Sequence, residues 1–241
     1  MKTFRSKSGP FLEQPYFTPD EIERICTDEL QKEGLYPAKP EHIRIERFIE
    51  KRFKVSPRYE DIPAGVLGYT KFGPHGVEAV VISRSLEENK TPSSRRRVNT
   101  TLAHEAGHGL LHTVLFSLAA AEDVAPLFGG EFYSKAQRIL CRDEDISGRE
   151  QQVVRRGYDG CWWEVQANKA MGALLLPRDL VIKCIDDMLV TRGSFNEKWL
   201  EQDRREKAVQ RLVDIFDVNP VVGRFRLQAI FPDLDGRQLT L

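Results

Sequence analysis

The sequence HEAGH at residues 104–108 constrains this chain more than any other feature. His104 and His108 are four positions apart, so on an α-helix their Cβ atoms lie roughly 5–6 Å apart on one face, and both imidazoles can bind one metal ion. Glu105 lies off that line, where it can reach a water molecule on the metal and act as a general base. The motif therefore predicts a helix that carries two ligands of a zinc hydrolase.

A catalytic zinc site takes three protein ligands and keeps one position open. His112 lies on the same predicted helix, but about 12 Å along the axis from His104, which is too far for one ion to bind all three histidines. The metzincin pattern also fails, because Val114 occupies the position of its third histidine. His112 is therefore expected to be a structural residue near the end of the helix.

Glu164 is the predicted third ligand. It lies at the start of an apolar helical segment, WWEVQANKAMGALLLP at residues 162–177, and a carboxylate at the buried edge of such a helix needs a partner such as a zinc ion. Asn168 follows one turn later on the same face, where its amide oxygen can accept the free ring N–H of a ligand histidine. The alternative is that Glu164 and Asn168 form a hydrogen-bonded pair at the surface.

The segments HEAGHGLLH and EVQANKAMGALLLP, in this order, resemble the ImmA/IrrE family of bacterial zinc metallopeptidases. The resemblance covers residues from about 40 to 190. It implies one zinc ion per chain with His104, His108 and Glu164 as ligands and Glu105 as the catalytic residue. It also implies a specific protein substrate, such as a helix-turn-helix repressor in stress response or mobile-element regulation.

The expected activity is that of a zinc metallo-endopeptidase. Glu105 would accept a proton from water and deliver it to the leaving nitrogen. Tyr158 and His112 are the nearest candidates, by residue type, for a hydrogen-bond donor to the tetrahedral oxyanion. The strand predicted at 77–83 is expected to form a cleft edge on which an extended substrate pairs as an added strand. The long segment 119–160, between the two metal-binding helices, is expected to flank this cleft.

The pattern of the chain predicts an α+β fold, in which a zincin-like core of helices packs on a small antiparallel β-sheet and a helical extension follows. The expected organisation is a flexible leader at 1–17, a metallopeptidase domain at 18–190 and a helical C-terminal extension at 191–241. The predicted elements are a helix between Thr18 and Gly34, a helix after Pro40, a hairpin of strands 66–72 and 77–83, the motif helix from about 94 to 118, and helices at 162–176 and 180–190.

The C-terminal segment 205–231 predicts two helices around a turn at 217–220, an arrangement similar to a helix-turn-helix, with Arg224 and Arg226 in the second helix. The segment is largely apolar, so packing on the core is the favoured prediction and direct nucleic-acid binding is not expected. The alternative to a peptidase is a non-proteolytic zinc-containing regulatory protein that binds a partner protein or DNA.

Charge gives no general attraction to nucleic acid or anionic membrane, because 36 Lys and Arg residues balance 36 Asp and Glu residues. Arg95, Arg96 and Arg97 stand in the first turn of the motif helix and are expected to be solvated there. The first residues contain no apolar stretch typical of a signal peptide, and the longest apolar run, 110–121, is too short to span a bilayer. A cytoplasmic protein without membrane contact is therefore expected.

Overall fold

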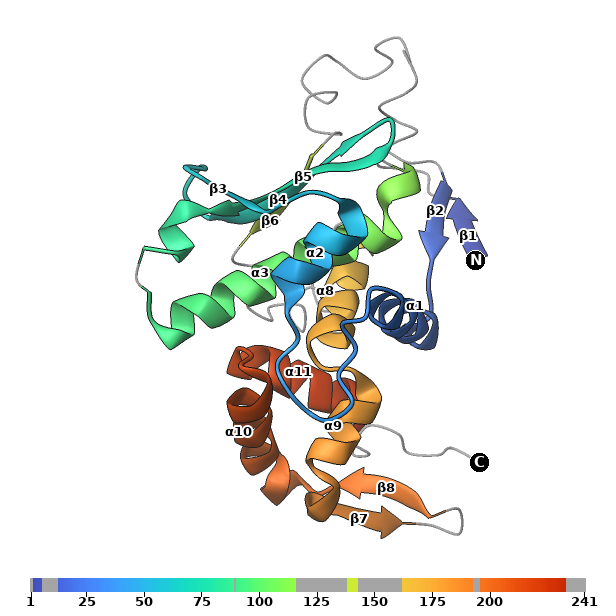
Figure 1. Cartoon of the computed structure of the whole chain (residues 1–241). Coiled ribbons are helices and arrows are strands. Elements are labelled where there is room, and N and C mark those ends of the chain that lie inside the picture. The colour runs from blue at the N-terminus through green and yellow to red at the C-terminus, as the bar shows by residue number, and fades with distance from the viewer. Residues whose placement is uncertain are drawn as a thin grey trace.

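The computed structural model describes the following residues of the chain: 2–5, 13–88, 90–115, 138–142, 162–192 and 196–232. The fold is α+β, as predicted. One long helix, α3 (Pro92–Leu111), lies between a four-stranded sheet and the helix α8 (Trp162–Leu175) (Figure 1). Tyr158, and most of the segment 119–160, lie outside the described residues.

The sheet is built around the predicted hairpin. Its strands, in the order β3-β5-β4-β6, are β3 (Arg58–Glu60), β5 (Gly76–Ser83), β4 (Val66–Gly73) and β6 (Arg138–Arg142). β4 pairs antiparallel with β5 and with β6, and Gly76 closes the hairpin with a φ of +116° that disfavours other residues. The predicted all-antiparallel sheet is wrong at one edge, because β3 runs parallel to β5. Between β3 and β5 the chain passes through β4, so no tight turn joins these two strands and imposes an antiparallel pairing.

The two N-terminal helices, α1 (Pro19–Lys32) and α2 (Ile45–Phe53), begin close to the predicted positions. The Thr18 hydroxyl accepts a hydrogen bond from the Glu21 backbone at 3.2 Å, and the Glu21 carboxylate accepts one from the Thr18 backbone at 2.8 Å. This capping box satisfies amides that a helix start leaves unpaired. Gly34 follows the helix with a φ of +66°, as expected of a residue that ends it.

The predicted leader contains regular structure, because β1 (Lys2–Arg5) and β2 (Glu13–Tyr16) pair as antiparallel strands. The chain after α8 also differs from the purely helical prediction. Its elements are α9 (Arg178–Cys184), β7 (Leu189–Arg192), β8 (Glu197–Leu200), α10 (Arg205–Phe216) and α11 (Pro220–Ile230). The predicted helix 180–190 stops early, and the chain forms the hairpin β7–β8, in which Val190 and Thr191 have β-branched side chains that favour strands.

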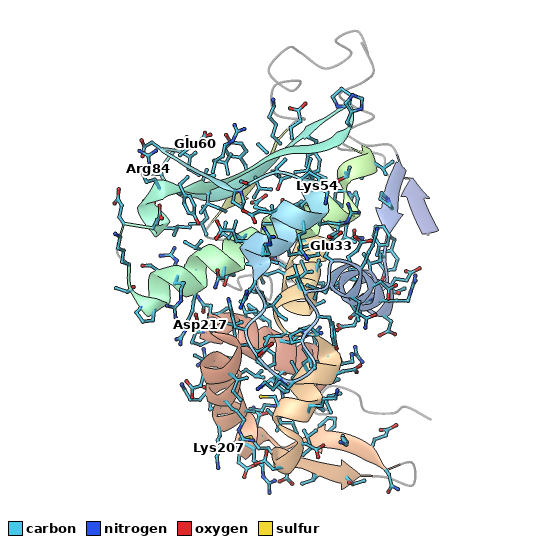
Figure 2. All side chains as sticks on the ribbon, viewed as in Figure 1. Glu33, Lys54, Glu60, Arg84, Lys207 and Asp217 are labelled. Atoms are coloured by element: carbon cyan, nitrogen blue, oxygen red, sulfur yellow. The ribbon has the colours of Figure 1, made fainter. Side chains whose placement is uncertain are left out.

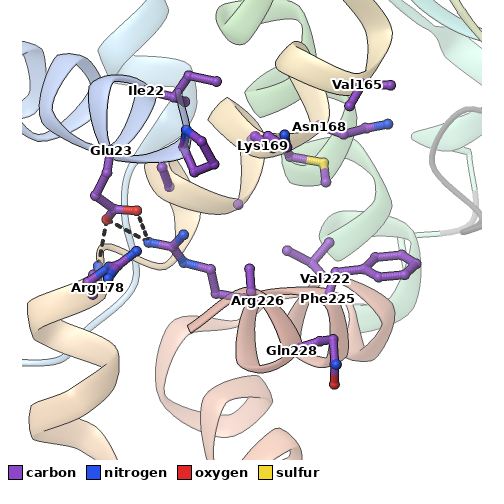
Figure 3. Close-up of a pocket in the computed structure, with 15 residues that line it drawn as sticks. Ile22, Glu23, Val165, Asn168, Lys169, Arg178, Val222, Phe225, Arg226 and Gln228 are labelled. Atoms are coloured by element: carbon purple, nitrogen blue, oxygen red, sulfur yellow. Dashed lines mark hydrogen bonds and ion pairs between the residues drawn. The ribbon is translucent and has the colours of Figure 1, made fainter. Parts of the chain in front are cut away.

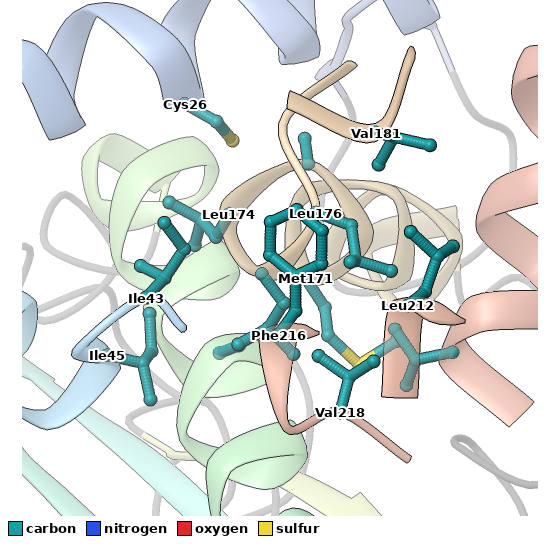
Figure 4. Packing of buried hydrophobic residues seen from close by; sticks show 14 of the residues in the cluster. Cys26, Ile43, Ile45, Met171, Leu174, Leu176, Val181, Leu212, Phe216 and Val218 are labelled. Atoms are coloured by element: carbon teal, nitrogen blue, oxygen red, sulfur yellow. The ribbon is translucent and has the colours of Figure 1, made fainter. Parts of the chain in front are cut away.

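One large buried cluster joins the helices to the sheet, and a small one forms around Phe72 of β4. Leu212 and Phe216 of α10 meet Met171 and Leu174 of α8 in the large cluster (Figure 4). The C-terminal helices are therefore packed on the core, and they do not form a separate module with a core of its own. Among the helices that the structure describes, none combines the length and the apolar character needed to cross a membrane.

The close packing of α3 on α8 depends on Gly107. A Cβ atom at this position would lie 3.0 Å from the Ala167 carbonyl oxygen and 3.0 Å from the Ala170 Cβ. These contacts involve backbone and a short side chain, which cannot swing aside. The absence of a side chain at Gly107 therefore sets the distance between the helices.

The substitution Gly107→Ala is expected to lower the free energy of unfolding by about 1–3 kcal/mol, because it forces α3 and α8 apart. Gly172→Ala, in α8, is the matched control. There the nearest atom to a new Cβ, the Arg226 Cδ, lies at an ordinary 3.7 Å, so this variant is expected to be as stable as the wild type or up to about 1 kcal/mol more stable. Urea unfolding measures both. Equal stability of the two variants would contradict the packing argument.

Candidate metal centre

The helix pair α3–α8 brings the three predicted ligands together. His104 and His108 leave α3 on the face that packs against α8, and Glu164 lies in the first turn of α8. The Nε2 atoms of the two histidines are 3.0 Å apart. The Glu164 Oε2 lies 3.0 Å from the His104 Nε2 and 3.4 Å from the His108 Nε2. Three donor atoms from two helices thus converge on one point.

The donor set fits a zinc ion. Tetrahedral zinc with bonds of about 2.0–2.1 Å needs ligand atoms about 3.3 Å apart, close to the separations found here. Two imidazole nitrogens and one carboxylate oxygen are also ligands that zinc takes in catalytic sites. Both histidines are fully buried. A bound cation would therefore offset the cost of burying the Glu164 carboxylate beside them.

The protonation states suit metal binding. Burial raises the pKa of Glu164, but interaction with the adjacent His108 and His104 rings outweighs this effect, so the pKa lies well below its usual range. Burial lowers the pKa of His108, and the attraction of Glu164 only partly opposes this effect. The carboxylate is therefore charged and His108 is neutral near pH 7, which are the forms that bind a metal.

Asn168 lies where the sequence analysis expected it. Its Oδ1 is 3.0 Å from the Nδ1 of His104. An amide oxygen can only accept, so the Nδ1 of His104 donates this hydrogen bond. In the neutral imidazole the Nε2 is then unprotonated and faces the other two ligand atoms.

His112 is not among the ligand atoms. It caps the C-terminus of α3, and its ring contacts the Nδ1 side of His108, at 3.1 Å, which is the side remote from Glu164. Burial, and then the charge of His108, lower the pKa of His112 to about 3, so it is neutral near pH 7. Its other ring nitrogen meets Gln166 at 3.1 Å. The structural position predicted for His112 is found, whereas no ring nitrogen of His112 faces the convergence point as an oxyanion donor would.

Glu105, the predicted base, is fully buried on the sheet side of α3. The Thr70 hydroxyl, from β4, donates a hydrogen bond to the Glu105 Oε2 at 2.6 Å and contacts the Glu105 carbonyl oxygen at 3.2 Å. Sequence reasoning missed Thr70, because nothing in the hairpin pattern marks one threonine among the inward residues of a strand. Its 0% exposure in a strand that packs on α3 distinguishes it only in the structure.

The strand order limits the predicted cleft edge to part of its strand. The strand at 77–83 corresponds to β5, which pairs with β4 on one side and, at residues 81–83 alone, with β3 on the other. Among the described strands, β6 is the last one on the side of β4, and its Ile139 lies opposite Thr70 in the register. Thr70 is the residue that contacts Glu105, so β6 is the strand at the described edge of the sheet that lies next to it.

The arginines of the C-terminal helices are engaged in ion pairs. Arg226 is 6% exposed, donates to the Leu176 carbonyl oxygen at 2.7 Å and pairs with Glu23 at 2.5 Å (Figure 3). Arg224 contacts Glu206 through two nitrogens, each at 3.0 Å. Arg226 is therefore turned into the protein, whereas Arg224 is exposed in a surface ion pair. The burial of Arg226 favours packing over nucleic-acid binding for this helix.

The arginines at the start of α3 were expected to be solvated, but two of them also bind a carboxylate. Arg95 and Arg96 hold the two carboxylate oxygens of Asp217 at 2.7 Å and 2.8 Å. Asp217 ends α10 with a φ of +51° and lies between that helix and the first turn of α3 (Figure 2). The first turn of α3 is therefore joined to the end of α10 by these ion pairs.

A cavity of about 370 Å³ lies between α1, α8 and α11 (Figure 3). Its lining is largely apolar and includes Ile22, Val165, Val222 and Phe225. Asn168 contributes to its wall, but none of the three ligand residues does. The cavity is thus separate from the point on which the ligand atoms converge.

A scan against models of protein families finds no match for this chain, and a search of curated proteins finds no significant match either. The resemblance to the ImmA/IrrE family therefore rests on the two sequence motifs.

The substitution Glu164→Gln is expected to abolish most zinc binding, because it removes the anionic ligand while leaving the size of the side chain unchanged. The exposed Glu41→Gln is the control, and it should bind about one zinc ion per chain, as expected of the wild type. The measurement is the zinc content of both variants after dialysis, determined by inductively coupled plasma mass spectrometry. Unchanged zinc content in Glu164→Gln would show that the third ligand is another residue.

Proposed function

We propose that the protein is a zinc-dependent endopeptidase, with one zinc ion per chain held by His104, His108 and Glu164. The observation that carries the proposal is the convergence of three ligand atoms, 3.0–3.4 Å apart, from α3 and α8, with Glu105 buried next to His104 on α3. Structural zinc sites are closed by four protein ligands, whereas catalytic sites have three and an open position. The cluster among the described residues offers three.

When bound, zinc would act as a Lewis acid that makes water a better nucleophile and polarises the carbonyl of the scissile bond. Glu105 would take the proton from the attacking water and pass it to the leaving nitrogen. Thr70 would hold the Glu105 carboxylate in place through its 2.6 Å hydrogen bond. Asn168 would keep the His104 ring in the orientation that directs its Nε2 inward.

The proposed substrate is a specific protein, such as a helix-turn-helix repressor, as the family resemblance implies. β6 ends the described sheet beside β4, the strand that carries Thr70. An extended peptide could add to such an edge through backbone hydrogen bonds. We propose a cytoplasmic location, for which the buried free thiols of Cys26 and Cys184 are compatible evidence.

The alternative, a zinc-containing regulatory protein that binds a partner or DNA without cutting, has weaker support. It requires no carboxylate beside the metal ligands, yet Glu105 is buried there at a high cost in solvation. DNA binding would also require basic side chains available to phosphate, whereas Arg226 is buried and paired with Glu23.

Glu105→Gln is expected to keep zinc and to lose peptidase activity, because the amide cannot accept the proton from water. The assay uses a peptide library from a digested bacterial proteome, incubated with zinc-loaded protein, with new peptide ends identified by mass spectrometry. Wild-type protein should produce new ends that share a sequence preference, and Glu105→Gln should produce none. Cleavage by the variant at the wild-type rate, or no new ends from zinc-loaded wild type, would refute the proposal.

Thr70→Val is expected to lower kcat about 10-fold, since a hydrogen bond to a charged group contributes about 1.5 kcal/mol. Zinc affinity should not change, because Thr70 contacts the base and not a ligand. Thr70→Ser retains the hydroxyl and should stay close to the wild-type kcat. The role assigned to Thr70 would be wrong if the valine and serine variants lost the same activity.

A further inference from the structure

We propose that His112 and Gln166 are positioning residues that hold His108 in the tautomer required of a metal ligand, through a hydrogen-bond chain anchored on the backbone of β2. This inference rests on the proposed zinc site and assigns a function to two buried polar residues that the proposed reaction does not use.

The chain of contacts is continuous. The Nδ1 atoms of His108 and His112 are 3.1 Å apart, and the His112 Nε2 lies 3.1 Å from the Gln166 Oε1. The Gln166 Nε2 lies 3.2 Å from the carbonyl oxygen of Pro15 in β2. His108 and His112 are 0% exposed and Gln166 is 5% exposed, so solvent does not compete with these hydrogen bonds.

The direction of every hydrogen bond in this chain of contacts follows from the one between Gln166 and Pro15. The Pro15 carbonyl can only accept, so Gln166 turns its NH₂ group to it and its carbonyl to His112. That carbonyl also only accepts, so the Nε2 of His112 carries the hydrogen. A neutral imidazole has a single N–H, so the Nδ1 of His112 is an acceptor. The Nδ1 of His108 must therefore be the donor.

The consequence lies at the metal centre. With its hydrogen on Nδ1, neutral His108 has an unprotonated Nε2, and this atom is 3.4 Å from the Glu164 Oε2. In the other tautomer a hydrogen on Nε2 would point at the position of the metal. The two ligand histidines are thus oriented differently, His104 by the amide of Asn168 and His108 by a relay that spans α3, α8 and β2.

His112 also fills space, since its ring stacks edge to face on Trp162 with centroids 5.4 Å apart. A test must therefore separate the loss of a hydrogen-bond acceptor from the loss of packing. His112→Phe keeps an aromatic ring and removes the acceptor. His112→Asn is smaller, but its Oδ1 can take the place of the ring Nδ1 as an acceptor. If His112 only fills space, His112→Asn should weaken zinc binding more than His112→Phe does. If His112 belongs to the hydrogen-bond chain, His112→Phe should weaken zinc binding more.

The experiment measures the affinity of the full chain for Zn²⁺ alone, by competition with a chromophoric chelator. His112→Phe should bind zinc about 10–100-fold more weakly than the wild type, the usual effect of losing a hydrogen-bond partner of a ligand histidine. His112→Asn should recover most of this loss. Thermal unfolding of the metal-free variants shows that each is folded. Wild-type affinity in His112→Phe, or an affinity in His112→Asn as low as that in His112→Phe, would overturn the proposal.

Gln166 gives an independent comparison if a variant at His112 does not fold. Gln166→Glu retains an oxygen that accepts from His112 and should keep most of the zinc affinity, whereas Gln166→Leu should lose it to the same degree as His112→Phe. Equal affinities for the two Gln166 variants would overturn the relay. Failure of the wild-type chain itself to bind Zn²⁺ would refute the metal centre and the relay with it, so that outcome is distinguished from failure of the relay alone.

Discussion

The contact between α3 and α8 is the constraint on which the rest of the molecule depends. The candidate ligands come from both helices, so the helix separation decides whether their donor atoms meet. Gly107, with Ala167 and Ala170 opposite it, allows a backbone approach that any larger residue would prevent. The sheet covers the opposite side of α3 and supplies Thr70. Because α3 is buried between two layers, it can direct His104 and His108 towards α8 while the sheet holds the carboxylate of Glu105.

Burying so many polar groups between two helices is costly unless each finds a partner. Three buried side chains around the convergence point, those of Glu105, His104 and His108, each have one. Thr70 of β4 holds Glu105, Asn168 of α8 holds His104, and His108 is held through His112 and Gln166. Such networks stabilise one arrangement of side chains, because every alternative leaves a buried donor or acceptor unsatisfied. These contacts thus fix the positions of the side chains that would hold the ion.

The C-terminal helices show why a similarity to a DNA-binding motif is weak evidence of DNA binding. Their basic residues hold the molecule together. Arg226 pairs with Glu23 of α1 inside the protein, and Asp217 is clamped by Arg95 and Arg96 of α3. The Arg226–Glu23 pair is buried, so removing one member would leave an uncompensated charge. The contacts of Asp217 join the end of α10 to α3, one of the two helices that build the metal centre.

Local rules determined much of this protein from its sequence. Periodicity placed His104 and His108 on one helix face, the capping box located the start of α1, and alternation located the hairpin β4–β5. Glu164 could be identified as a candidate ligand because an apolar helix carried an acid that required a partner. Tertiary structure alone decided the parallel strand β3, the hairpin β7–β8, and the contacts of Thr70 with Glu105 and of Gln166 with Pro15, which join residues 35 and 151 positions apart. The physical reason is that helix and strand periods relate only near neighbours, whereas these contacts depend on how complete elements pack.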